Sequence, residues 1–213
     1  MKKENERITE VVFVLDRSGS MHDLVEDTIG GFNTVLQQQK EKEGRAFITT
    51  MLFNSQFRYL HDHLDIHDVR KITREEYFPS GCTALYDAIG QSINKLDGIT
   101  ACETNADVLV VIITDGLENS SREFEGGTIR KMIEACKEKG WEFLFLGANI
   151  DSFAVSGSLG IDRSRTANWH ADKKGVNVSY SCLNNVITGF RNAGVMEEAP
   201  LEAVNRDYES RQK

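Results

Sequence analysis

The stretch VVFVLDRSGS, residues 11–20, joins a continuous apolar run to a short polar loop. The run is β-branched and aromatic without polar alternation, which is typical of a strand covered on both faces in a parallel sheet. Two more runs share this character, VLVVII at residues 108–113 and FLFL at residues 143–146. We expect a further strand over Ala46–Phe53 and a last short one within Arg163–His170.

Apolar residues between these runs recur at helical spacing, and each set gives one apolar face that can lie against a sheet. The four sets are Val25, Ile29, Phe32 and Leu36; Leu85, Ile89, Ser92 and Leu96; Ile129, Met132, Ile133 and Cys136; and Val178, Leu183, Val186, Ile187 and Phe190. Gly30-Gly31 falls inside the first set and is expected to permit close helix–sheet packing. The alternation of strands and helices favours an α/β fold with a doubly wound (Rossmann-like), mostly parallel six-stranded sheet and helices on both faces.

One segment breaks this alternation because its apolar and polar residues alternate. The apolar parity is carried by Leu60, Leu64 and Ile66, and the polar parity by His61, His63, Asp65 and His67. This pattern predicts one half-exposed antiparallel edge strand, in a hairpin that turns at Asn54-Ser55. The three histidines on one face could ligate a second metal, but we favour a solvated face that guards the edge against pairing.

Length and charge limit the classes of function. A chain of 213 residues suits one large α/β domain, alone or with a short extension. A net charge of −8 argues against nucleic-acid and anionic-membrane binding. The apolar run that starts at Val11 is too short for a signal-peptide core or a membrane span, so we expect no membrane insertion and a cytoplasmic location. The four cysteines lack C-x-x-C spacing and are interpreted as reduced thiols.

Carboxylates and hydroxyls follow two of the predicted strands at their C-terminal ends. Asp16, Ser18 and Ser20 alternate after the first strand, where Gly19 allows a tight turn, and Asp115 follows the VLVVII run. Open α/β sheets bind ligands at the strand ends where the strand order reverses, so two acidic ends that meet there predict a cation site. Because all the donors are oxygens and none is Cys or His, a hard cation is indicated and zinc is disfavoured.

These residues resemble the metal-ion-dependent adhesion site (MIDAS) of von Willebrand factor type A (vWA) domains. Its three parts stand in order here: Asp16-x-Ser18-x-Ser20, Gly81-Cys82-Thr83-Ala84-Leu85 and Thr114-Asp115-Gly116. The resemblance covers residues 8–192, which leaves 1–7 as an N-terminal extension and 193–213 as a charged C-terminal tail or short helix. The segments Thr28–Asn33 and Gly81–Ala88 resemble stand-alone bacterial members, some of which sit near tellurite-resistance and stress operons.

The resemblance implies a role for each residue of the site. Ser18 and Ser20 would ligate the metal directly, and Thr83 would do so directly in an open form and through water in a closed form. Asp16 and Asp115 would act mostly through water and hydrogen bonds, with Asp115 moving to direct contact on closure. The expected metal is Mg²⁺, with Mn²⁺ and Ca²⁺ as alternatives, and an Asp or Glu of a partner protein would complete its coordination.

Two other functions stay open on the sequence alone. A metal-dependent phosphohydrolase could use Asp16 as its nucleophile. Phosphatases of the haloacid dehalogenase type carry a second aspartate at the position of Ser18, and no nucleophile–base pair can be named, so we expect no enzyme. A scaffold could instead act through its C-terminal tail, where Leu201, Val204 and Tyr208 make a weak helical stripe. Cys82 is interpreted as a small neutral filler of its turn.

Overall fold

The computed structural model describes residues 7–100 and 106–212 of the chain. Within these residues six strands form one sheet in the order β3-β2-β1-β4-β5-β6. The strands are β1 (Ile8–Asp16), β2 (Arg45–Phe53), β3 (Phe57–Asp65), β4 (Ala106–Thr114), β5 (Glu142–Ala148) and β6 (Thr166–Trp169). All neighbours pair in parallel except β2 and β3, which are antiparallel. This confirms the predicted, mostly parallel sheet with one antiparallel edge strand.

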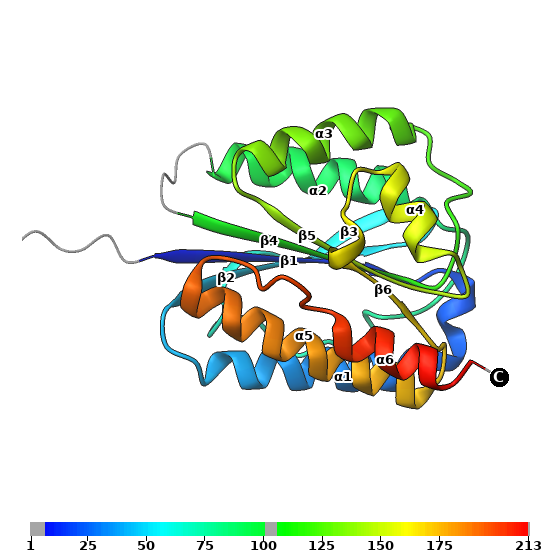
Figure 1. Ribbon diagram of the computed structural model, residues 1–213, viewed down its shortest axis with the longest axis horizontal. Coiled ribbons are helices and arrows are strands. Elements are labelled where there is room, and N and C mark those ends of the chain that lie inside the picture. Colours follow the sequence, from blue (N-terminus) through cyan, green and yellow to red (C-terminus); the bar gives the residue numbers. More distant parts are fainter. Residues whose placement is uncertain (1–6, 101–105, 213) are drawn as a thin grey trace, which may run out of the picture.

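Helices cover both faces of the sheet (Figure 1). One face carries α1 (Val25–Lys40), α5 (Lys173–Ala193) and α6 (Glu202–Ser210), and the other α2 (Leu85–Thr100), α3 (Gly126–Glu138) and α4 (Ser152–Ser158). Two short 3₁₀ helices are η1 (Gly19–Leu24) and η2 (Arg163–Arg165). Successive residues of β1 enter opposite cores: Phe13 packs with the α1 and α5 side, and Val14 with the α2 and α3 side. None of the described helices is long and apolar enough to cross a membrane.

The four helices predicted from apolar spacing are all present, but α4 was missed. Its sequence SFAVSGS is too short to show an apolar stripe, and it contains a glycine. The signal that was available is its cap, because the Asp151 side chain accepts the N–H of Ala154 at 3.0 Å.

The faces predicted for β3 are wrong. The β2–β3 ladder slips between Ile48 and Thr50 and again between Thr50 and Met51, and such bulges re-aim the side chains that follow. As a result His61 is buried, with Nδ1 3.0 Å from the Thr50 hydroxyl, whereas Leu64 is exposed. The strand therefore does not present its histidines on one solvated face.

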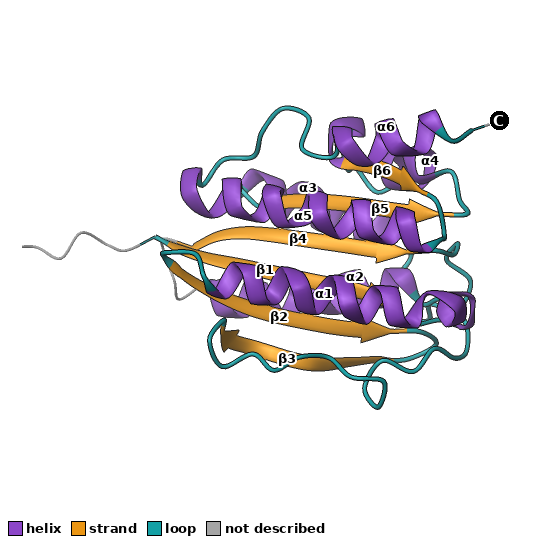
Figure 2. Cartoon of the chain, turned by 90° about the horizontal axis from the view of Figure 1, so that it is seen from below, coloured by secondary structure: helices purple, strands orange, loops and turns teal. Residues whose placement is uncertain are grey.

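The segment after α5 closes the β6 edge of the sheet (Figure 2). Leu201 and Val204 are buried, and Asn205 donates to the carbonyl of Thr166 at 3.1 Å. The structure therefore has a short helix within residues 193–213. The predicted domain limits stay predictions, and residues 1–6 of the predicted N-terminal extension lie outside the described residues.

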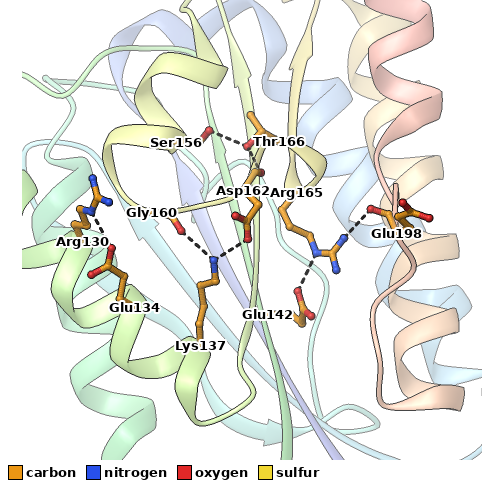
Figure 3. A network of polar contacts seen from close by, with 10 residues as sticks. All are labelled: Arg130, Glu134, Lys137, Glu142, Ser156, Gly160, Asp162, Arg165, Thr166 and Glu198. Atoms are coloured by element: carbon orange, nitrogen blue, oxygen red, sulfur yellow. Dashed lines mark hydrogen bonds and ion pairs between the residues drawn. The ribbon is translucent and has the colours of Figure 1, made fainter.

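Ion pairs fasten the β5–β6 edge at the end of the sheet where the parallel strands begin (Figure 3). Arg165 pairs with Glu142 at 2.9 Å and also donates to the carbonyl of Glu198 at 3.0 Å. Lys137 on α3 pairs with Asp162 at 2.7 Å. This network holds the end of the sheet opposite to Asp16 and leaves the other end to the loops described below.

Gly31 lies where α1 packs on α5, and not against the sheet as expected. A Cβ at Gly31 would come within 2.3 Å of the buried Tyr180 ring, whereas a Cβ at Gly30 would meet nothing within 4 Å. We expect Gly31→Ala to lower the free energy of unfolding by about 2 kcal/mol through overpacking. Gly30→Ala should raise it by up to about 1 kcal/mol through helix propensity. Urea denaturation measures both, and equal stability of the two variants would contradict the close approach.

Candidate metal centre

The candidate centre lies at the point where the strand order reverses. β2 follows β1 on one side and β4 lies on the other, so the C-terminal ends of β1 and β4 are neighbours. Asp16 is the last residue of β1, and Asp115 follows Thr114, the last residue of β4. The two acidic strand ends therefore meet at the position where open α/β sheets bind ligands.

Asp16 is fixed on three sides. Its Oδ1 accepts the N–H of Ser18 and its Oδ2 accepts the hydroxyl of Thr114, both at 2.6 Å. The Tyr77 hydroxyl donates to its backbone carbonyl at 2.5 Å. Burial raises the pKa of Asp16 to about 6, and the charge of Asp115 adds to this, while the hydrogen bonds from Thr114 and Ser18 lower it. The carboxyl group is therefore held rigidly, and burial disfavours its charged form.

Ser18 and Ser20 connect Asp16 to Asp115. Ser18 Oγ lies 3.1 Å from Ser20 Oγ, and Ser20 Oγ donates to Asp115 Oδ1 at 2.5 Å. Asp115 is 3% exposed, and burial raises its pKa. The loop after β1 thus presents alternate oxygens to one place, as its alternating sequence predicted.

Thr83 reaches the same place from a different loop. Gly19 donates its N–H to the carbonyl of Gly81 at 3.1 Å, which joins the two loops. A Cβ at Gly116 would lie 3.2 Å from Thr83 Oγ1 and 3.7 Å from Ser20 Oγ, so both hydroxyls flank this glycine. All five residues predicted from the sequence are therefore gathered at one end of the sheet.

Two asparagines that sequence reasoning missed position the Thr83 loop. Asn119 accepts the N–H of Thr83 on its Oδ1 at 2.8 Å, and its own N–H donates to the Thr83 carbonyl at 3.0 Å. Asn54 donates from Nδ2 to the carbonyl of Ser80 at 2.8 Å. Asn54 was interpreted only as a turn former, and nothing in the sequence pointed to Asn119. Cys82, expected to fill the turn, is exposed.

The loop after Asp115 is fastened to the start of α2 by two further carboxylates. Glu118 Oε2 accepts the N–H of Tyr86 at 2.9 Å. Asp87 accepts the N–H groups of three consecutive residues, Arg122, Glu123 and Phe124, at 2.8 to 2.9 Å. These bonds hold the loop that carries Asp115 and Asn119 against the helix that follows Thr83.

The residues present fit a hard divalent cation. Asp16 and Asp115 are 1% and 3% exposed, and no lysine or arginine of the described residues is among the charges that shift either pKa. Buried carboxylates without a counter-charge are costly, and a cation bound between oxygen donors would compensate them. No group of three or more His, Cys, Asp or Glu side chains suited to a metal occurs in the described part of the chain, so hydroxyls would have to supply ligands here.

Comparison with solved structures shows the fold. The von Willebrand factor (vWF) domain of the type V pili tip protein Mfa5 from Porphyromonas gingivalis matches with TM-score 0.61 and 12% identity over 91% of this chain and 98% of that one. A PilB minor pilin mutant from Streptococcus sanguinis matches with TM-score 0.63 and 14% identity over 91% of this chain and 64% of that one. Proximal thread matrix protein 1 from the mussel byssus, with a zinc-occupied MIDAS motif, matches with TM-score 0.61 and 11% identity over 86% of this chain and 46% of that one.

This chain thus spans just under half of the mussel protein and just under two thirds of the pilin. No curated protein matches the sequence at a significant level. The family model for the von Willebrand factor type A domain matches residues 10–165, which run from β1 to η2 and include all three parts of the candidate centre. The chain belongs to the von Willebrand factor type A domain family.

Proposed function

We propose that this chain is a Mg²⁺-dependent protein-interaction module. Ser18 and Ser20 hold the metal directly, and Thr83 contacts it directly or through water according to the state of the site. Asp16 and Asp115 supply charge, chiefly through water and hydrogen bonds. An Asp or Glu of a partner protein completes the coordination, and Mn²⁺ and Ca²⁺ are the alternative metals.

One observation carries this proposal. A continuous path of short contacts runs from Asp16 through Ser18 and Ser20 to Asp115, and both carboxyl groups are buried. Two carboxylates and three hydroxyls leave a divalent cation with little surplus negative charge around it and with room for a further oxygen ligand. A carboxylate from outside can supply this ligand, since little surplus negative charge repels it.

We propose binding and not catalysis at this centre. Domains of this family are generally interaction modules. Both oxygens of Asp16 already accept hydrogen bonds, and Ser18 stands where the second acid of a phosphatase would be. A screen of phosphate esters with Mg²⁺ should show no turnover. Turnover that disappears in Asp16→Asn would overturn this part of the proposal.

Asn119→Ala should weaken Mg²⁺ binding by about tenfold, because residues that orient metal ligands typically contribute 10–100-fold to affinity. The change removes the side-chain acceptor for the N–H of Thr83 and replaces none of the proposed ligands. Calorimetric titration of Mg²⁺ measures the effect. Asn177→Ala, an exposed asparagine on α5, serves as the matched control and should bind as the wild type does. An unchanged affinity in Asn119→Ala would contradict the positioning role.

The partner can be sought by affinity capture from the native cell. The full chain and its Ser18→Ala variant are immobilised, and extracts are applied with Mg²⁺ or with a chelator. We expect a protein that the wild type retains only with Mg²⁺ and that Ser18→Ala does not retain. Retention that is the same with chelator and in the variant would contradict metal-dependent binding.

The proposed setting is the bacterial cytoplasm, in a stress or tellurite-resistance-like system. The support is the likeness of Thr28–Asn33 and Gly81–Ala88 to stand-alone bacterial members of the family. The pilus proteins among the structural neighbours share the fold with this chain, and their location is not carried over. Fractionation of the native cell tests the location.

A further inference from the structure

Two arginines lie beside the candidate centre at the same end of the sheet. Arg17 directly follows Asp16, and its N–H donates to the carbonyl of Phe53, the last residue of β2, at 2.7 Å. Arg58 lies at the start of β3 and pairs with Leu52. Because β3 runs antiparallel to β2, its first residues lie at the end of the sheet where β1 and β2 finish (Figure 2).

Both guanidinium groups are bound to one short segment, Glu76–Phe78. Arg17 Nη1 donates to the carbonyl of Phe78 at 3.5 Å, and Arg58 Nη2 donates to the carbonyl of Glu76 at 3.2 Å. Between them Tyr77 is fully buried and donates to the Asp16 carbonyl at 2.5 Å. The segment that anchors both arginines is therefore itself anchored to the strand end that carries the centre.

The charges of these arginines are not neutralised by close ion pairs. Among the ion pairs of the described residues, none involves Arg17 or Arg58. Burial lowers the pKa of Arg17, and the like charge of Arg58 lowers it further. Arg17 Nε is buried without a hydrogen-bond partner in the described part of the chain.

Glu76 is an acidic side chain within electrostatic reach of Arg58, and its own hydrogen bonds go to Thr73. Its Oε2 accepts both the N–H and the hydroxyl of Thr73 at 2.8 Å. The charges of Arg70 and Arg58 act on it from a longer range. A guanidinium has five N–H donors, and each arginine donates to one carbonyl. Each therefore keeps N–H donors that the described part of the chain does not use.

The segment that anchors the arginines also carries an exposed apolar side chain. Phe78, whose carbonyl accepts from Arg17, exposes 67% of its surface although its neighbour Tyr77 is fully buried. Aromatic residues and arginine are enriched at protein–protein interfaces relative to the rest of the surface. The metal centre, two arginines and this phenyl ring thus share one end of the molecule.

We propose that Arg17 and Arg58 bind a second acidic side chain of the partner, next to the acidic residue that completes the metal centre. Phe78 packs against the apolar part of the same partner segment. The inference rests on the proposed function and specifies its partner as a segment with two neighbouring acidic residues. The metal selects a carboxylate, and the guanidinium forks select those segments that carry another one nearby.

Synthetic peptides test this without knowledge of the partner. One peptide carries a single Glu in a Gly/Ser background, and a set of others carries a second Glu one to four residues away. Binding to the full chain at saturating Mg²⁺ is followed by NMR titration for the wild type, Arg17→Gln and Arg58→Gln. The matched control is Arg130→Gln, whose ion-pair partner Glu134 lies on the same helix, α3 (Figure 3).

The best two-Glu peptide should bind the wild type about tenfold more tightly than the one-Glu peptide, as expected for a charge-assisted, partly desolvated contact. The ratio should fall to about threefold or less in Arg17→Gln and in Arg58→Gln, and should persist in Arg130→Gln. Added salt should reduce the ratio, because exposed charges are screened. Mg²⁺ affinity should be the same in the wild type, Arg58→Gln and Arg130→Gln.

Failure of this inference can be distinguished from failure of the proposed function. If one-Glu and two-Glu peptides bind equally at every spacing, or if the ratio persists in both arginine variants, the inference is overturned while the metal-dependent function stands. If no peptide binds in the presence of Mg²⁺, the proposed function fails and the inference falls with it. Arg58→Gln lies outside the metal loop, so it tests the inference even if Arg17→Gln disturbs that loop.

Discussion

Asp16→Asn should stabilise the metal-free protein and abolish its response to Mg²⁺. At neutral pH the buried Asp16 is charged although its pKa is raised to about 6, so the folded state carries a penalty of about 3 kcal/mol. An asparagine removes this charge and keeps the contacts. Its Oδ1 can accept from Ser18, and its amide can donate to the Thr114 hydroxyl, which in turn donates to the Gly116 carbonyl at 3.1 Å.

The pH dependence has a definite sign. Between the ordinary aspartate pKa of 3.8 and the folded value of about 6, the folded state binds more protons than the unfolded state. Stability of the metal-free wild type should therefore rise as the pH falls through this window. The rise should be smaller in Asp16→Asn, where Asp115, whose pKa burial also raises, still contributes.

Thermal unfolding at pH 5 and pH 7.5, with and without Mg²⁺, measures these effects. Without metal at pH 7.5 the variant should melt higher than the wild type, and with saturating Mg²⁺ the order should reverse. A variant that is less stable than the wild type without metal, or that gains as much from Mg²⁺, would contradict this description of the buried carboxyl group.

Asp87→Ala should destabilise the protein by about 3 kcal/mol, because it removes a charged acceptor from three consecutive backbone N–H groups in a half-buried loop. The loop that carries Asp115 and Asn119 would lose its attachment to α2, so Mg²⁺ affinity should fall as well. Asp87→Asn keeps one acceptor oxygen and should lose less stability.

Guanidinium denaturation and Mg²⁺ titration of both Asp87 variants check this prediction. Glu138→Ala, on the exposed end of α3, is the control for removal of an acidic side chain from a helix. If Asp87→Ala unfolds at the same denaturant concentration as that control, the three hydrogen bonds do not hold the loop.

Much of this arrangement could be predicted because it depends on periodicity. The VLVVII run and the apolar stripe of α1 each indicate their element without knowledge of the rest of the chain. The rule that parallel strands end at one edge then brings Asp16 and Asp115 together. Family resemblance added Thr83, whose loop has no strand end to mark it.

The features that could not be predicted from the sequence depend on contacts between distant residues. The two bulges of β3 shift the parity of its side chains, which a regular alternation cannot reveal, so His61 was placed on the wrong face. Asn119 and Asp87 act through partners 36 and 35 positions away in the chain. The partner of Gly31 is Tyr180 on α5, and neither residue indicates the other in the sequence.

Calorimetric titration of Mg²⁺ into the wild type and into Ser18→Ala tests the proposed metal centre most directly. Ser18 is buried, contacts Ser20 at 3.1 Å, and would be a direct ligand. We predict a saturable binding heat with one ion per chain in the wild type and none in Ser18→Ala under the same conditions. Equal binding heats in the two proteins, or no heat in either, would contradict a magnesium centre built from these residues.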